Sequence, residues 1–200
     1  IQEQLDQVAE KIHAKREKAL PKLINELETI LKSLGMENAT FKAEVTLSDA
    51  YAFNGKDELS FLFSANKGGT YGVLKKVASG GELSRIMLSI KVILSRYTKL
   101  PTIIFDEIDT GVSGEVAHKM ADLMRSMSKN LQVISITHLP QIAANGERHY
   151  KVFKEDLDTS TVTRLKLLNP TERINEIAEM IGGKDISESA LTHAKSLLQV

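Results

Sequence analysis

The sequence predicts an α/β fold in which a mostly parallel sheet is flanked by helices and preceded by a helical stub. Three observations favour this class. Apolar runs typical of strands alternate with helical patterns through the middle of the chain, which is how parallel sheets are built. The run Ile103–Phe105 ends abruptly in Asp106 and Glu107, as expected for a strand buried on both faces that leads to a ligand site. The first 34 residues repeat apolar side chains at helical spacing.

The N-terminal pattern has heptad-like spacing and predicts a long helix that ends near Gly35. Its apolar positions fall into two sets that are out of phase around Pro21, where we expect a kink or a break. A continuous helix of this length would reach about 50 Å, more than a compact domain of this size can cover. We therefore expect residues 1–35 to be the root of a longer coiled coil and residues 36–200 to form a separate globular region. The alternative is an amphipathic core helix.

The remaining elements follow in order along the chain. Alternating apolar residues predict a strand over 40–47, Asn54-Gly55 marks a turn, and a second strand covers 59–64. Apolar periodicity and β-rich runs then predict a helix over 82–97, a strand over 102–105, a helix over 113–127, a strand over 131–136, a short helix after Pro140, a hairpin from 150–153 and 161–167, and helices over 171–180 and 187–198.

Composition limits the classes of function. Charged residues make up 26% of the chain, apolar residues 42%, and the formal net charge is zero, which argues against a strongly basic nucleic-acid binder. There is no cysteine, so disulfides and thiolate metal sites are excluded. No apolar run reaches about 18 residues, and we expect no membrane partner. The chain begins inside a helical pattern without a methionine, so we expect it to be part of a longer protein.

The acidic pair is the first candidate site. Neighbouring residues on a strand point to opposite sides, which favours a separate role for each carboxylate. Asp106 would hold Mg²⁺, in part through water, because this ion keeps several of its waters. Glu107 would orient the attacking water and accept its proton. The alternative is a strand end that simply runs into solvent.

A second candidate is the turn Ser79-Gly80-Gly81-Glu82, which precedes a helical stripe. A hydroxyl and successive backbone amides at a helix N-terminus form a cradle for phosphate. The alternative is an ordinary glycine turn that caps the helix. Such a loop cannot enclose a nucleotide alone, so we interpret it as a half-site for the γ-phosphate of ATP held by another subunit.

His138 is the third candidate, because it follows a strand of buried type and a threonine. It could hydrogen-bond the γ-phosphate or position the water. The other four histidines, His13, His118, His149 and His193, are expected at the surface. The turn-rich loop from Asp109 to Gly114 is either a plain connection to the next helix or a segment that lies against a partner subunit and links two sites.

The usual phosphate-binding loop is missing. That loop requires Gly-x-x-x-x-Gly-Lys followed by Ser or Thr. Gly55-Lys56 and Gly183-Lys184 are each followed by aspartate, and neither fits the pattern. We therefore expect this chain to be inactive as an ATPase on its own.

Four segments resemble the ATP-binding-cassette (ABC) head of the structural-maintenance-of-chromosomes (SMC) group. They are Val77–Ile86, Ile104–Gly114, Ile136–Ala144 and Glu176–Gly183. Ser-Gly-Gly-Glu alone would fit many cassette ATPases, but the longer strings are specific, and the resemblance covers nearly the whole chain. The family's Walker A loop and Q-loop have no counterpart here.

The resemblance implies the C-terminal lobe of an ABC-type head with ATP and Mg²⁺ as cofactors. Ser79, Gly80, Gly81 and Glu82 become the signature, Asp106 the magnesium carboxylate, Glu107 the base, and His138 the switch histidine, while Asp109 falls in the D-loop. Implied partners are the Walker A lobe of the same protein, a second head that sandwiches ATP, and DNA. The implied role is double-strand-break repair and recombination at the nucleoid in the bacterial cytoplasm.

Two alternatives stay open at this point. A transporter's nucleotide-binding domain is disfavoured because glutamate replaces the usual glutamine after Gly81 and a coiled-coil-like helix precedes the head. A structural coiled-coil module whose head dimerises without hydrolysing ATP is the other. Replacing Glu107 by glutamine in the assembled protein discriminates between them.

Overall fold

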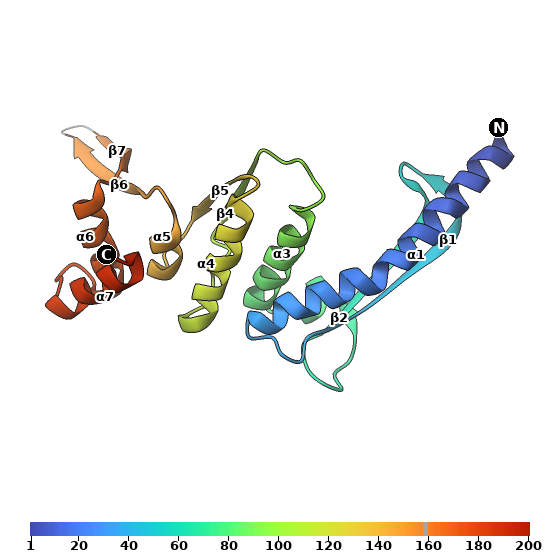
Figure 1. Cartoon of the computed structure of the whole chain (residues 1–200), viewed down its shortest axis with the longest axis horizontal. Helices are drawn as coiled ribbons and strands as arrows, with labels where there is room; N and C mark the ends of the chain where they lie inside the picture. The colour runs from blue at the N-terminus through green and yellow to red at the C-terminus, as the bar shows by residue number, and fades with distance from the viewer. Residues whose placement is uncertain (158–159) are drawn as a thin grey trace. The chain divides into compact units, whose positions relative to one another are not determined.

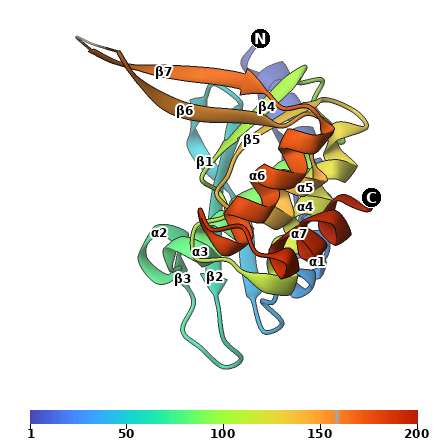
Figure 2. The ribbon, with the colours of Figure 1, turned by 90° about the vertical axis from the view of Figure 1, so that its left-hand side faces the viewer.

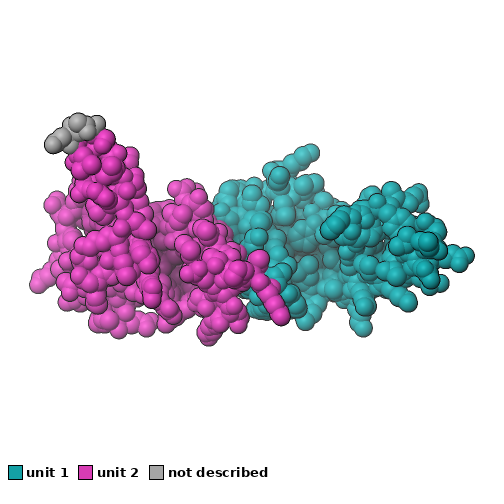
Figure 3. Space-filling view, turned by 90° about the horizontal axis from the view of Figure 1, so that it is seen from above, with its two compact units in different colours: residues 1–98 teal, residues 99–200 magenta. Residues whose placement is uncertain are grey.

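The computed structural model describes residues 1–157 and 160–200, which form two compact units, residues 1–98 and 99–200 (Figure 1; Figure 3). The first unit contains α1 (Gln2–Ser33), β1 (Thr40–Ala52), β2 (Gly55–Ser64), β3 (Gly72–Val73), α2 (Leu74–Val77) and α3 (Gly80–Leu94). The second contains β4 (Thr102–Asp106), α4 (Gly114–Ser128), β5 (Gln132–Ile136), α5 (Pro140–Asn145), β6 (Tyr150–Leu157), β7 (Ser160–Leu167), α6 (Pro170–Gly182) and α7 (Glu188–Leu198). The predicted α/β class is confirmed.

Helix α1 continues through Pro21, where the sequence predicted a kink or a break. A proline inside a helix removes one backbone hydrogen bond. The turns that follow compensate by burial: Leu27 and Leu31 are buried against Phe63 and Ile86 in the core of the first unit. Each fully buried side chain of this size contributes roughly 1.5–3 kcal/mol. The end of α1 is thus part of a packed core, and a coiled coil over residues 1–35 stays a prediction.

Strands β1 and β2 form an antiparallel hairpin. Its turn is the predicted one, because Ala52 pairs with Gly55 across two intervening residues, and Gly55 has a φ of 118° that favours glycine. Near the core, Phe41 pairs with Phe63 and stacks on Phe61, with ring centroids 5.0 Å apart. The hairpin therefore joins the core at one end and extends along α1 at the other.

Charged contacts hold the hairpin to α1. Asp57 accepts hydrogen bonds from Arg16 Nη1 and His13 Nδ1, both at 2.7 Å. Burial raises the pKa of Asp57, but these two partners outweigh it and the pKa is lowered overall. Nearer the helix start, Asp6 accepts a hydrogen bond from the Tyr51 hydroxyl at 2.6 Å. His13, expected at the surface, is therefore a structural partner.

The parallel part of the fold is the pair β4 and β5. Ile104 lies opposite Ile134 and Asp106 opposite Ile136, so both strands end at the same edge. The other described strands pair antiparallel, so the predicted mostly parallel sheet is present only in this pair. A short hairpin can join only antiparallel strands, which accounts for β1 and β2.

Helices α4 to α7 and the ribbon β6–β7 complete the second unit (Figure 2). Helix α4 buries its small and methionine side chains, and α6 and α7 pack together through Ile177, Ala178, Ala190 and Ala194. Lys151 on β6 is paired with Glu176 and Glu179 on α6, which ties the ribbon to that helix. Among the described residues, no helix is both long and apolar enough to cross a membrane.

Candidate functional site

The predicted signature turn is the N-terminus of α3. Ser79 is the N-cap, and its hydroxyl accepts a hydrogen bond from the Glu82 amide at 3.4 Å while Glu82 Oε2 accepts one from the Ser79 amide at 2.7 Å. The Ser79 hydroxyl also donates to Glu82 Oε2 at 2.8 Å. This is a complete capping box, so the helix end is stable without a ligand.

Gly80 lies at the first position of α3 and faces open space. A Cβ built on Gly80 would meet nothing within 4 Å. The first amides of a helix have no carbonyl partner within it, and the dipole makes this end attractive to anions. The turn thus has the chemistry to contact a phosphate, with Glu82 beside it as part of the cap.

The acidic pair lies at the carboxyl end of β4. Asp106 is the last residue of the strand and is exposed. Glu107 has already left the strand, with a φ of 48°. The prediction that both residues occupy one extended strand is therefore wrong: the chain turns at Glu107, so strand alternation does not set the direction of this side chain. A non-glycine residue in this region costs of order 1–3 kcal/mol.

Hydrogen bonds hold this bend. The Glu107 amide donates to the Ile136 carbonyl at 3.2 Å, which extends the pairing of β4 and β5 by one residue. The Glu107 carbonyl accepts from the Thr110 hydroxyl at 2.9 Å and from the Thr110 amide at 3.3 Å. The unusual backbone of Glu107 is therefore fixed from both sides, and its carboxylate stays exposed.

His138 follows β5 at the same edge. Its ring is 65% exposed, and Nδ1 lies 3.8 Å from Oδ2 of Asp109. Asp109 has no exposed surface and accepts a hydrogen bond from the Thr137 hydroxyl. The Thr137 hydroxyl in turn accepts one from the Leu139 amide at 3.0 Å. The role of Thr137 was not predicted, although its position directly before His138 was noted.

The structure gathers four of the predicted site residues in the second unit: Asp106, Glu107, Asp109 and His138. Ser79 to Glu82 belong to the first unit. The described residues hold no group of three or more metal-ligating side chains. A lone exposed carboxylate such as Asp106 suits Mg²⁺, which binds through one or two carboxylates and completes its shell with water and substrate phosphates.

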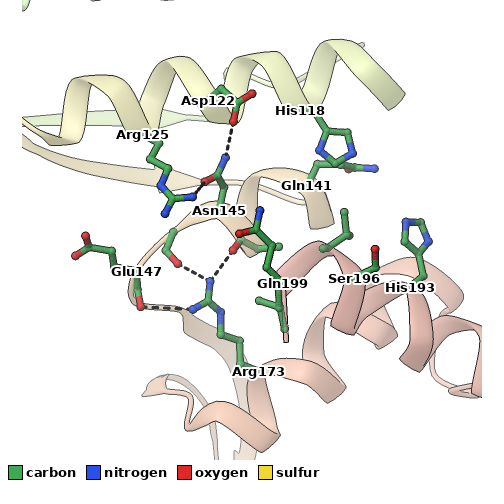
Figure 4. Close-up of a pocket in the computed structure, with 14 residues that line it drawn as sticks. His118, Asp122, Arg125, Gln141, Asn145, Glu147, Arg173, His193, Ser196 and Gln199 are labelled. Atoms are coloured by element: carbon green, nitrogen blue, oxygen red, sulfur yellow. Dashed lines mark hydrogen bonds between the residues drawn. The ribbon is translucent and has the colours of Figure 1, made fainter.

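The second unit also has a polar cavity that the sequence did not predict (Figure 4). It has a volume of about 510 Å³ and is lined by α4, α5, α6 and α7, with His118 and His193 at its border. Arg173 donates to the carbonyls at the end of α5, including Ala144 at 2.8 Å, and burial lowers its pKa. The guanidinium therefore caps α5, which is a structural role.

His149 is half-buried and not at the surface as expected. Burial lowers the pKa of His149 from its usual value of 6.5, and the nearby Arg173 adds to this effect. No signal in the sequence distinguished it from the exposed histidines.

Comparison with curated proteins gives relatives over nearly the full chain. A DNA repair protein RecN of Haemophilus influenzae is 38% identical over 199 residues, and one of Rickettsia typhi is 43% identical over 198 residues. Each match covers 99% of this chain. The chain belongs to the RecN family. It spans 36% of the length of these RecN relatives, and it corresponds to their C-terminal part. No protein-family model matches it.

Solved structures show that this RecN-family chain has the fold of an SMC head. An SMC ATPase structure aligns with a TM-score of 0.55 at 19% identity and covers 84% of this chain and 97% of that one. The Smc head with a coiled coil and joint from Pyrococcus yayanosii aligns with a TM-score of 0.60, also at 19% identity, covering 82% of this chain and 30% of that one. The expected SMC-type head fold is confirmed.

Proposed function

We propose that this chain is the C-terminal lobe of an ATP-hydrolysing head, and that the complete protein acts in DNA double-strand-break repair and recombination at the bacterial nucleoid. The observation that carries the proposal is the common edge of β4 and β5, where Asp106 ends β4, Glu107 follows it at the bend, and His138 follows β5. The relatives are DNA repair proteins by name. A structure of the same fold comes from a study of ATP-driven dimerisation and DNA-stimulated activation of SMC ATPases.

Each residue at this edge has a separate role. Asp106 holds Mg²⁺, which neutralises charge on the phosphates when bound. Glu107 accepts a proton from the attacking water as general base. His138 contacts the γ-phosphate. Exposure of all three side chains fits groups that meet a ligand rather than each other.

The signature half-site acts on a second head. Ser79, Gly80 and Gly81 present a hydroxyl and backbone amides at the positive end of α3. With no Walker A loop in the chain, this turn contacts the γ-phosphate of ATP held by another copy of the head. ATP is then sandwiched between two heads, and dimerisation depends on the nucleotide.

The remainder of the same protein is the partner that completes each head. The β4–β5 pair exposes Ile104, Ile134 and Ile136 by 62%, 42% and 54%. Ile104 and Ile134 are paired across the strands, and Ile136 lies two residues further along β5, so the three share one face. A parallel pair is normally covered on both faces. Since this chain spans only 36% of its relatives' length, we infer that the Walker A lobe of the same protein covers this face.

The test is ATP turnover by this chain alone and after mixing with the preceding part of the protein. We expect no turnover alone, and turnover on mixing that falls roughly 10²–10⁴-fold with Glu107→Gln, the range typical of a lost general base. Glu147→Gln is the matched control, because Glu147 is another exposed carboxylate of the second unit and lies outside the edge.

Two results would contradict the proposal. Turnover by the chain alone would show that phosphates are held without a Walker A loop. Absence of turnover after demonstrated assembly would favour the alternative of a dimerisation module that does not hydrolyse ATP.

A further inference from the structure

Asp109 is a buried carboxylate without a full set of partners. It has no exposed surface. Its Oδ2 accepts a hydrogen bond from Thr137, but Oδ1 has no hydrogen-bond partner among the described residues. Burying a carboxylate costs several kcal/mol unless it is paired and hydrogen-bonded. A plain connection between a strand and a helix has no need of such a group, so the position calls for another explanation.

The contacts of Asp109 converge on the backbone around His138. Thr137 precedes the histidine and donates to Asp109, while the same hydroxyl accepts from the Leu139 amide that follows it. One hydroxyl thus fixes the chain on both sides of His138. The ring itself is largely exposed, and its Nδ1 lies 3.8 Å from Oδ2 of Asp109.

The backbone of Asp109 belongs to the turn that follows the bend at Glu107. The Val112 amide donates to the Asp109 carbonyl at 3.1 Å, and Thr110 donates to the Glu107 carbonyl. Since the Glu107 amide is bonded to Ile136, the turns after β4 and β5 form one hydrogen-bonded unit. Asp109 lies inside that unit.

We propose that Asp109 is the positioning residue for His138. Through Thr137 it fixes the backbone of the histidine, and its carboxylate takes the Nδ1–H of the ring after a small rotation that shortens the 3.8 Å approach. Nε2 is then directed outward as the free nitrogen. A carboxylate that orients a histidine selects its tautomer in this way.

This inference rests on the proposed function only for what Nε2 contacts. The resemblance placed Asp109 in the D-loop and made it a candidate cofactor-binding residue, whereas its complete burial makes it act through its neighbours. In the assembled head, Nε2 faces the γ-phosphate and takes up a proton that it donates to a phosphate oxygen, while Asp109 balances the charge of the doubly protonated ring. The orientation itself is a property of this chain alone and is testable without ATP.

The first experiment is nuclear magnetic resonance of the chain labelled with ¹⁵N-histidine, at a pH of about 8.5 where histidine is neutral. We expect His138 to be protonated on Nδ1, and Asp109→Asn to shift it to the Nε2–H form. Thr137→Val keeps the shape but removes the hydroxyl, and we expect the same shift, while Thr137→Ser restores the Nδ1–H form. The exposed His193 is the internal reference.

The tautomer of His138 decides whether the inference holds. An unchanged His138 signal in both Asp109→Asn and Thr137→Val would overturn it. If Asp109→Asn does not fold, the Thr137→Val and Thr137→Ser pair decides alone, since valine and serine each keep part of the threonine side chain.

A second readout separates positioning from the proposed function. In the assembled ATPase, we expect Thr137→Val to lower kcat by about 10-fold with little change in KM, by analogy with the loss of groups that orient ligands of metal sites, and Thr137→Ser to restore it. A shifted tautomer with unchanged kcat would keep the positioning and contradict the role of His138 in hydrolysis. An unshifted tautomer with active enzyme would contradict the positioning alone.

Discussion

The two halves of the candidate site differ in how much of their structure is explained by folding alone. At the N-terminus of α3, Ser79 and Glu82 satisfy each other's polar groups in a capping box. At the edge of β4 and β5, Glu107 adopts a φ of 48°, and Asp109 carries a buried oxygen that has no hydrogen-bond partner in the described part of the chain. Strained or unsatisfied groups persist where the surroundings hold them, and they cluster at functional sites. The acidic edge therefore gives stronger physical evidence of function than the signature turn.

The largest stability effect is expected at the cap, and it tests whether the signature turn does more than end a helix. Ser79→Ala removes the side-chain acceptor and should lower the free energy of unfolding by about 1 kcal/mol. Ser79→Asn restores an N-cap acceptor and should recover most of that stability. Urea denaturation of the chain measures both.

Turnover of the assembled protein then completes the comparison. If the Ser79 hydroxyl contacts phosphate, Ser79→Asn lowers turnover although the helix is stable. Full activity of Ser79→Asn would show that the Ser79 hydroxyl acts only as a helix cap.

The second prediction concerns strain at the acidic edge. Glu107→Gly should raise the free energy of unfolding by roughly 0.5–1 kcal/mol, because glycine adopts a positive φ without the steric cost of a side chain. Glu107→Ala keeps the strain and is the matched control. Equal stability of the glycine and alanine variants would show that the bend is unstrained and would weaken the contrast between the two halves.

The sequence predicted this edge better than it predicted the geometry within it. An apolar run that ends in acids and a β-rich run before a histidine were enough to place Asp106, Glu107 and His138 near each other. The bend at Glu107 depends on hydrogen bonds from Thr110 and to Ile136, which no local pattern predicts. Burial of Asp109 likewise depends on contacts with residues about 28 positions away in the chain.

Other errors have the same origin in long-range contacts. Pro21 predicted a break because proline is disfavoured inside a helix. The turns of α1 that follow it are nevertheless held by the core. The mostly parallel sheet was inferred from alternating strands and helices, but the strands that the structure describes include only one parallel pair. Turn chemistry at Asn54-Gly55 is local, and that prediction was confirmed.

The smallest effect is expected from His149, a half-buried group away from the edge that serves as a reference. Its pKa is lowered in the folded state, so the folded protein favours the neutral ring. The stability that the neutral His149 ring contributes is fully present above pH 6.5, the usual pKa of histidine. It falls as the pH drops from there toward the lower pKa of His149 in the folded state.

Unfolding at several pH values measures this dependence. His149→Gln should reduce the loss of stability below pH 6.5, whereas His193→Gln, at an exposed site, should leave it unchanged. The same pH slope in all three proteins would show that His149 is not the group responsible.

Helix α1 has a mechanical consequence that follows from where it is held. One end is packed through Leu27 and Leu31 against Ile86 of α3, and the remainder is braced by the hairpin through Asp57 and Asp6. The helix and hairpin can then move as one rigid lever that pivots at its packed contact with α3. With 32 residues at 1.5 Å each, a tilt of about 10° at the fulcrum displaces the far end by roughly 8 Å. Conversely, a force applied to the far end of α1 is transmitted to α3 as a torque.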